Sequence, residues 1–259
     1  MKKAILILTT LIMILSSCKP NKPVVTEPTI ISKEGKQVIN YLILGDAWMW
    51  DWNKFYAQYI QEDLGISVIT HNLSDSDKLS STMLLKSLKK EAKIREQVST
   101  ADIITFNADP GFSNGFCMNK STEKEGNNCF DETIENWRKN FRSIIHEIKL
   151  LAGSKGVVLQ TMTFQHSPYF SDMWKKNDRF DECIQCWRDL NQALLEVARE
   201  EEIQTANVYQ VFNGLDGLQN PEDNGYDTKG DFDLLSNESG YVVIAGLFRS
   251  LGYIVFLPQ

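Results

Sequence analysis

Short apolar runs alternate with longer amphipathic segments along most of this chain. The clearest run starts at Val38 and stops abruptly at Gly45-Asp46, as a buried parallel strand does when it ends in a turn. Strand-like runs that alternate with helical periodicity indicate βαβ units. We therefore expect an α/β fold, a three-layer α/β/α sandwich around a five-stranded parallel sheet. Further strands are expected at residues 66–70, 101–107, 156–161 and 204–208, and helices at residues 53–64, 80–97, 133–151, 179–202 and 240–251.

The end of the first strand is where we expect a binding site. In an open parallel sheet, ligands bind outside the carboxyl ends of the strands. Asp46, Ala47 and Trp48 follow the strand directly and should line the mouth of that crevice. Trp48, Trp50 and Trp52 occupy alternate positions. They predict either an aromatic platform for apolar or sugar rings, or ordinary core packing under the first helix.

The first residues have the features of an export signal. Lys2 and Lys3 precede an apolar stretch, residues 4–15, that is too short to span a bilayer as a mature helix. The stretch ends in Leu-Ser-Ser-Cys, with Cys18 last, and resembles a bacterial lipobox. The resemblance implies cleavage before Cys18 and acylation of that cysteine, which would hold the protein at a membrane. The alternative is an ordinary signal peptide with an incidental cysteine.

The chain then divides into a tether and one domain. Residues 1–18 form the predicted signal, the proline-containing residues 19–36 a flexible tether, and residues 37–259 a single α/β domain. We expect an exported protein that is lipid-anchored to the bacterial cell envelope. Because Lys19 and not an aspartate follows the cysteine, we expect sorting to the outer membrane where two membranes are present.

The charge of the chain excludes one class of partner. The net charge is -7, and the loss of two positive charges, Lys2 and Lys3, with the signal makes it -9. An acidic chain without a basic run is a poor nucleic-acid binder. No metal-ligand spacing occurs around Asp46 and Asp51. We expect no metal, no cofactor and a monomer.

Several stretches together resemble one family of ester hydrolases. The Leu-Gly-Asp-Ala run at residues 44–47 resembles the first block of the SGNH, or GDSL, hydrolases, in which Gly-Asp-Ser presents the nucleophilic serine. The later blocks of the family have similar stretches here at residues 72–77, 101–109, 208–214 and 239–245. The resemblance covers nearly all of the mature chain. It implies the flavodoxin-like sandwich of that family and an esterase or lipase activity.

The departures from the family pattern fall on its chemistry. In the family a serine attacks, a histidine removes its proton, and an aspartate orients the histidine. Here the serine position holds Ala47 and the histidine position holds Leu235. A one-residue shift pairs Asp231 with Leu234 and supplies no histidine either. Because an alanine methyl cannot attack a carbonyl, the pattern predicts a non-catalytic descendant of the fold.

Other residues are candidates for ligand binding or for a displaced catalytic role. Asn107 and Asp109 follow the third strand, where the resemblance implies an Asn-Asp pair. His166 follows the fourth strand and is the best candidate for a base; the alternative is a loop histidine without a catalytic partner. His71 is expected in a local turn and His146 on a solvated helix surface.

Four cysteines beyond Cys18 form an even set in an exported chain, which favours disulfides. Cys117 and Cys129 bracket a polar loop, and the family resemblance implies that this loop is stapled. Cys183 and Cys186 lie at the start of a long helix, where we expect a structural bridge. The alternatives are a redox site, which would place its CxxC at a strand-to-helix turn of another fold, and a Cys₄ zinc site, which would need paired CxxC spacing.

Two classes of function remain open at this point. The first is a membrane-anchored lipoprotein on a lapsed SGNH scaffold that binds an envelope saccharide or an acylated ligand. The second is an active SGNH-type esterase or lipase with displaced catalytic residues. The two differ in whether a hydroxyl near Ala47 lies within reach of a histidine.

Overall fold

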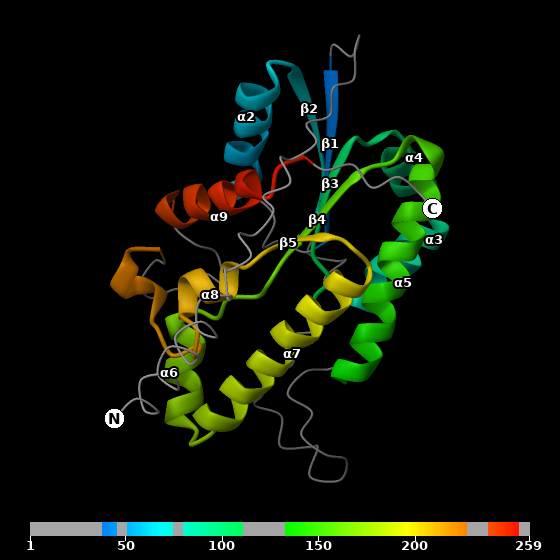
Figure 1. The fold of residues 1–259 in the computed structure, drawn as a ribbon. Helices are drawn as coiled ribbons and strands as arrows, with labels where there is room; N and C mark the ends of the chain where they lie inside the picture. The colour runs from blue at the N-terminus through cyan, green and yellow to red at the C-terminus, as the bar shows by residue number, and fades with distance from the viewer. Residues whose placement is uncertain (1–37, 46–50, 75–79, 111–132, 227–237, 254–259) are drawn as a thin grey trace, which may run out of the picture.

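The central feature of the computed structural model is an open parallel sheet with helices on both faces (Figure 1). The model describes residues 38–45, 51–74, 80–110, 133–226 and 238–253. Its strands are β1 (Val38–Gly45), β2 (Ser67–Ser74), β3 (Ile103–Phe106), β4 (Val158–Met162) and β5 (Gln204–Ala206). All neighbouring strands are parallel, in the order β2-β1-β3-β4-β5. The predicted three-layer sandwich with five parallel strands is confirmed.

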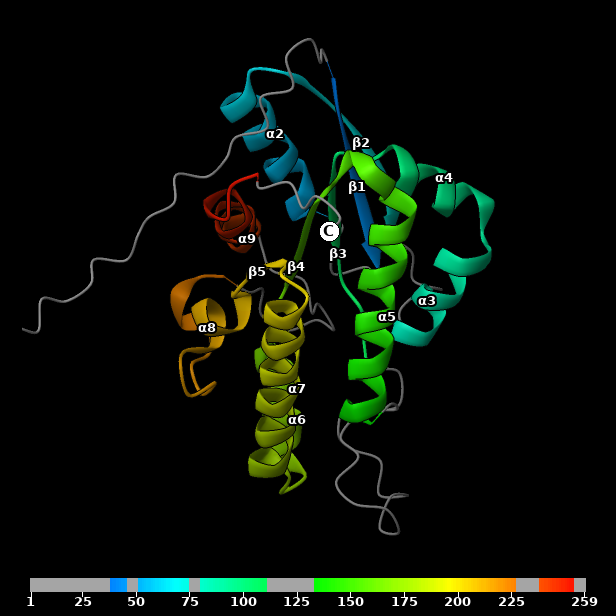
Figure 2. The same cartoon turned by 45° about the vertical axis from the view of Figure 1, so that its right-hand side comes forward.

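The helices form one layer on each face of the sheet. They are α2 (Trp52–Leu64), α3 (Ser81–Lys90), α4 (Ala92–Thr100), α5 (Ile134–Ala152), α6 (Pro168–Lys176), α7 (Phe180–Glu200), α8 (Val208–Asn213) and α9 (Glu238–Ser250), with short 3₁₀ turns η4 (Gly153–Lys155) and η5 (Pro221–Asn224). α2 and α9 pack together on one face, and α3, α4 and α5 lie on the other (Figure 2). α7 packs beside α5 and also against α6.

The strand register brings three strand ends to one edge. Gly45 at the end of β1 pairs with Ser74 at the end of β2, and Leu44 pairs with Phe106 at the end of β3. The carboxyl ends of these strands are therefore level with one another. This is the edge at which an open α/β sheet binds its ligands.

Two tyrosines in the largely apolar interior bond to polar side chains of the sheet. The Tyr41 hydroxyl lies 2.9 Å from that of Thr105, and the Tyr56 hydroxyl donates to Gln160 Oε1 at 2.6 Å. Burial raises the pKa of both phenols well above the ordinary value. Both tyrosines are thus neutral core residues: Tyr41 links β1 to β3, and Tyr56 links α2 to β4.

Local signals explain where most helices begin and end. Gly65 adopts the left-handed conformation, with φ of 63°, and ends α2 as its position in the sequence indicates. The Ser80 and Thr133 side chains cap α3 and α5 by accepting from the Met83 and Asn136 amides. The helix predicted at residues 80–97 is two helices, because the backbone is extended at the residue between them.

The predicted signal and tether, residues 1–36, lie outside the described residues. Within the described part of the chain, no helix combines the length and apolarity needed to cross a membrane. The lipid anchor at Cys18 stays a prediction.

Candidate functional site

The carboxyl ends of β1 and β3 approach each other closely at Gly45. Its φ of +115° is a conformation that glycine tolerates and other residues rarely adopt. A Cβ at this position would lie 2.3 Å from the carbonyl oxygen of Asn107. The Asn107 amide in turn donates to the Leu44 carbonyl at 3.1 Å. The point where β1 delivers the chain to the predicted crevice therefore accepts only glycine.

A buried polar segment follows β3 at this edge. Asn107 is 1% exposed and Asp109 is 3% exposed. The Ala108 carbonyl accepts a hydrogen bond from the Trp137 indole at 2.7 Å, and the Asp109 carbonyl accepts one from the Ser81 amide at 2.7 Å. The segment is thereby fixed to α5 and α3. It places the buried amide of Asn107 and the buried carboxyl group of Asp109 just after the end of β3, close to the end of β1.

The last residues of β2 make a local side-chain hydrogen bond. Asn72 Oδ1 accepts hydrogen bonds from the Ser74 amide at 2.9 Å and from the Ser74 hydroxyl at 2.5 Å. The hydroxyl group of Ser74 therefore donates its proton to the side chain of Asn72. Residues 75–79, which complete the second family-like stretch, lie outside the described residues.

His166 lies after β4 inside a cage of aromatic rings. His166 is only 2% exposed. The ring centroids of Trp174, Trp187 and Tyr209 lie 5.5, 6.2 and 6.2 Å from its own. The Asn213 side chain bonds to both the His166 amide and its carbonyl, each at 3.0 Å. The cage leaves the imidazole no contact with a ligand in the crevice.

Both ring nitrogens of His166 are engaged. Nε2 lies 2.9 Å from the Gly217 carbonyl oxygen, which can only accept, so Nε2 carries the proton. Nδ1 then accepts from the Ser171 hydroxyl at 3.1 Å. Burial lowers the pKa of His166 to about 4, with the charges of Lys175 and Arg188 acting in the same direction. The interpretation of His166 as a crevice base is corrected: it is a neutral, enclosed side chain.

Comparison with solved structures decides the fold family. The chain is similar to a lipase from a goat rumen metagenome, with a TM-score of 0.63 and 20% identity over 83% of this chain and 98% of that one. It is also similar to a GDSL-like lipase from Bacteroides thetaiotaomicron, with a TM-score of 0.52 and 15% identity over 82% of this chain and 86% of that one. The chain has an SGNH hydrolase-like fold. No family model and no curated protein matches it.

Four of the positions predicted from the SGNH pattern are not described. Asp46, Ala47 and Trp48 follow Gly45 directly in the chain and lie outside the described residues, as does Leu235. The described part of the predicted crevice is therefore the edge formed by β1, β2 and the segment after β3. The ligand-binding roles of Asp46 and Trp48, and the loss of catalysis at Ala47 and Leu235, stay predictions.

The SGNH base is a histidine, and all three histidines of this chain are described. His166 is enclosed in its aromatic cage. His71 lies within β2, in register with Leu42 and so three residues before the end of β1. His146 lies on α5, where Nε2 is 2.9 Å from the Glu201 carboxylate. His166 and His146 are thus engaged by partners of their own, namely Ser171 and Gly217 for His166 and Glu201 for His146.

One of the three tryptophans predicted to form an aromatic platform at the crevice, Trp52, lies in the core instead. Trp52 is fully buried and stacks on Phe248, with ring centroids 4.4 Å apart and 10° between the ring planes. It packs α2 against α9 and belongs to the core, which is the alternative that the sequence left open. Trp48 and Trp50 lie outside the described residues.

Cys183 and Cys186 lie near the start of α7 and are 1% and 6% exposed. Residues three apart on a helix share one face, at about the separation that a disulfide can bridge. Cys117 and Cys129 lie outside the described residues. Within the described ranges, no group of histidine, cysteine, aspartate and glutamate side chains could hold a metal ion.

We expect Cys117 to be bonded to Cys129 and Cys183 to Cys186 in the mature protein. By the chain-entropy estimate the longer loop contributes about 3 kcal/mol to the free energy of unfolding. Peptide mapping without reductant identifies the pairs. Four free thiols, or one zinc ion per chain, would contradict this assignment.

The hydrogen-bond partners of His166 were not identified from the sequence. Ser171 lies in α6, a helix that Phe170 and Trp174, four residues apart and both buried, could have indicated. Gly217 lies 51 residues from His166 in the chain, in a loop without a periodic pattern. Its contact with the imidazole depends on tertiary structure alone.

Proposed function

We propose that this chain is a membrane-anchored, SGNH hydrolase-like lipoprotein that binds an envelope saccharide or an acylated ligand without cutting it. One observation carries the proposal. Position 47 is alanine, and none of the three histidines of the chain stands at the family position that Leu235 occupies. Without a nucleophile and a base, the serine mechanism of the family has no first step.

The polar edge of the sheet supports a binding role. Asn107 can donate and accept hydrogen bonds, and Asp109 can accept them from ligand hydroxyls, once a ligand reaches the segment after β3. Trp48, next to Ala47 in the chain, offers an indole for a sugar ring or an acyl chain. Two of the similar solved structures are named as lipases, which favours a ligand with an acyl group.

A second candidate function has one specific observation in its favour. Ser171 Oγ, His166 Nδ1 and, across the ring, His166 Nε2 and the Gly217 carbonyl form a hydroxyl–imidazole–acceptor chain. Such a chain is the arrangement of a nucleophile, a base and an orienting group. Two properties of His166 argue against this displaced esterase, namely its burial and its pKa of about 4. Both disfavour the imidazolium that a base must form.

The purified mature protein is expected to hydrolyse p-nitrophenyl acetate and butyrate no faster than buffer does. Loss of a serine triad costs about 10⁶-fold in kcat, which removes measurable turnover. Ala47→Ser alone should stay inactive because Leu235 supplies no base, whereas a double variant with Leu235→His tests whether the scaffold can regain activity. Release of p-nitrophenol measures all three proteins. Robust turnover by the wild type would overturn the proposal.

A serine-directed fluorophosphonate separates the two candidate functions. We expect no labelling of the wild-type protein. Labelling that Ser171→Ala abolishes would establish the displaced esterase instead. Ser143→Ala is the matched control, because Ser143 is also a helix serine, and its hydroxyl donates to the backbone carbonyl of Lys139.

The anchor is tested separately, by cell fractionation. We expect wild-type protein in the membrane fraction and Cys18→Ala in the soluble fraction, because two or more acyl chains on one residue bind a bilayer stably. Recovery of unmodified wild-type protein in the soluble fraction would contradict the anchor and leave the crevice proposal untouched.

A further inference from the structure

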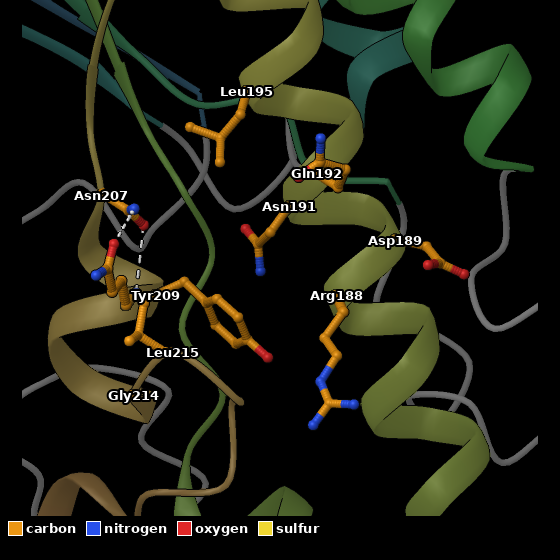
Figure 3. Close-up of a pocket in the computed structure, with 10 residues that line it drawn as sticks. Arg188, Asp189, Asn191, Gln192, Leu195, Asn207, Tyr209, Gly214 and Leu215 are labelled. Atoms are coloured by element: carbon orange, nitrogen blue, oxygen red, sulfur yellow. Dashed lines mark hydrogen bonds between the residues drawn. The ribbon is translucent and has the colours of Figure 1, made fainter. Parts of the chain in front are cut away.

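A cavity of about 460 Å³ lies between α7 and α8 (Figure 3). It is near β5, at the opposite end of the sheet from β2 and β1. Its lining residues come from α7 and from residues 207–215, which follow β5. Its volume falls in the range of about 300 to 1,000 Å³ that is typical of small-molecule sites. Because it shares no lining residue with the Gly45 edge, it is separate from the crevice discussed above.

Side-chain amides supply most of the hydrogen-bonding groups of this cavity. Gln192 Nε2 donates to Glu196 Oε1 at 2.9 Å, and Asn207 Nδ2 donates to Gln210 Oε1 at 2.8 Å. These two bonds do not use the carbonyl oxygen of Gln192 or the amide nitrogen of Gln210. Both glutamines are exposed at the rim. The rim thus offers an acceptor and a donor to a ligand that contains both kinds of group.

The floor of the cavity is already occupied by structural bonds. Asn191 bonds with its side chain to the backbone amide and carbonyl of Phe164, at 2.7 and 2.9 Å. The buried ring of Tyr209 projects toward α7 beside it (Figure 3). These residues hold the shape of the site, so binding by the rim does not require them to move.

The charges at the cavity offset one another. The Arg188 guanidinium projects into it from α7, and both its Nε and one terminal nitrogen donate to the Asp216 carbonyl (Figure 3). Asp189 lies next in the chain and is also a lining residue. At the Tyr209 hydroxyl, burial raises the pKa, Arg188 lowers it and Asp216 raises it, so charges of both signs act at one place. A ligand with a net charge gains no general attraction here.

Two leucines complete the lining. Leu195 and Leu215 face the cavity from its two walls (Figure 3), and Leu215 is 87% exposed. Apolar contact on the walls together with amides on the rim suits a ring that has C–H faces and a hydroxyl edge. A plain acyl chain would make only the apolar contacts and would gain no hydrogen bonds from the rim amides, which are exposed and stay bonded to water.

We propose that this α7/α8 cavity binds a neutral, hydroxyl-rich ligand of the size of a mono- or disaccharide. Gln192 and Gln210 would contact the ligand hydroxyls, and Leu195 and Leu215 the ring face. The proposal does not rest on the function proposed for the crevice, because none of these residues belongs to it. A protein whose crevice binds or cuts would still have this second site.

The test uses the mature chain and isothermal titration with four probes. N,N′-diacetylchitobiose and cellobiose are the neutral sugars, galacturonate is the charged sugar and decanoate the acyl compound. We expect a neutral disaccharide to bind and Gln192→Ala or Gln210→Ala to weaken its affinity by about threefold to tenfold, the loss of one hydrogen bond. Both side chains are exposed, so the variants should fold.

Gln58→Ala is the matched control for Gln192→Ala. Gln58 is an exposed helix glutamine whose Nε2 donates to Glu62 Oε1 at 2.8 Å, the same i to i+4 bond as at Gln192, but it lies on α2. Its replacement should leave sugar affinity unchanged. Absence of sugar binding, or sugar binding that both rim variants leave intact, would overturn the proposal. Binding of decanoate or galacturonate in place of the sugars would overturn the ligand class.

Discussion

Gly45→Ala is expected to lower the free energy of unfolding by about 3 to 5 kcal/mol, the sum of backbone strain and overpacking. The added methyl would lie 2.3 Å from the Asn107 carbonyl oxygen, which is main chain and cannot turn aside as a side chain would. The φ of +115° adds strain for any residue with a Cβ. A loss of this size is a large part of the stability of a typical domain, so we expect poor yield or partial unfolding near ambient temperature.

Gly65→Ala separates the clash from the strain. Gly65 also has positive φ, +63°, but a Cβ there meets nothing within 4 Å. It should therefore cost only the left-handed backbone penalty of about 1 to 2 kcal/mol. Urea unfolding followed by far-UV circular dichroism measures both variants. Equal losses at the two positions would show that β1 and β3 do not approach as closely as the structure has them.

The sheet was predictable because its strands are long apolar runs that end at turn residues. β1, β3 and β4 are almost entirely buried, which is the situation in which apolar runs identify parallel strands well. β2 is different, since it lies at the sheet edge and all of its residues are exposed or half-buried. The strand was predicted at residues 66–70, but it continues to Ser74, because its last residues are mostly polar and do not form an apolar run.

The break between α3 and α4 shows what periodicity can miss. Leu84 and Leu88 mark one buried stripe and Ile94 and Val98 another, and the step of six residues from Leu88 to Ile94 changes the helical face. The backbone at Glu91 is extended, with ψ of 110°. A change of phase within a helical pattern therefore indicated a boundary, although no proline or glycine marks it.

The candidate site was less predictable than the fold. The sequence located Asn107 and Asp109 after β3 because position relative to a strand is a local property. It misjudged His166, whose environment depends on Trp187 and Gly217, residues far away in the chain. The α7/α8 cavity was missed for the same reason, because two segments meet there only in the folded state.

Acid is expected to destabilise the domain through His166, and the effect has a defined range of pH. The pKa of this imidazole is about 4 in the folded protein, against 6.5 for an unperturbed histidine. Between these values the unfolded chain binds a proton that the folded chain does not. The free energy of unfolding therefore falls as the pH is lowered from 6.5 to 4, by about 1.4 kcal/mol per pH unit and by about 3 kcal/mol in total. Above pH 6.5 this histidine contributes no pH dependence.

His166→Gln removes the titration while its amide can still donate to the Gly217 carbonyl, as Nε2 does in the wild type. The variant should be less stable at pH 7 and should lose most of the slope between pH 6.5 and 4. His146→Gln is the control, because the His146 side chain is 62% exposed on the helix surface, outside the aromatic cage, and its Nε2 lies 2.9 Å from the Glu201 carboxylate. Urea midpoints at half-unit pH steps give the slopes. If His166→Gln kept the wild-type slope, the acid sensitivity would belong to other groups. The imidazole would then not be the enclosed neutral ring that its aromatic cage indicates.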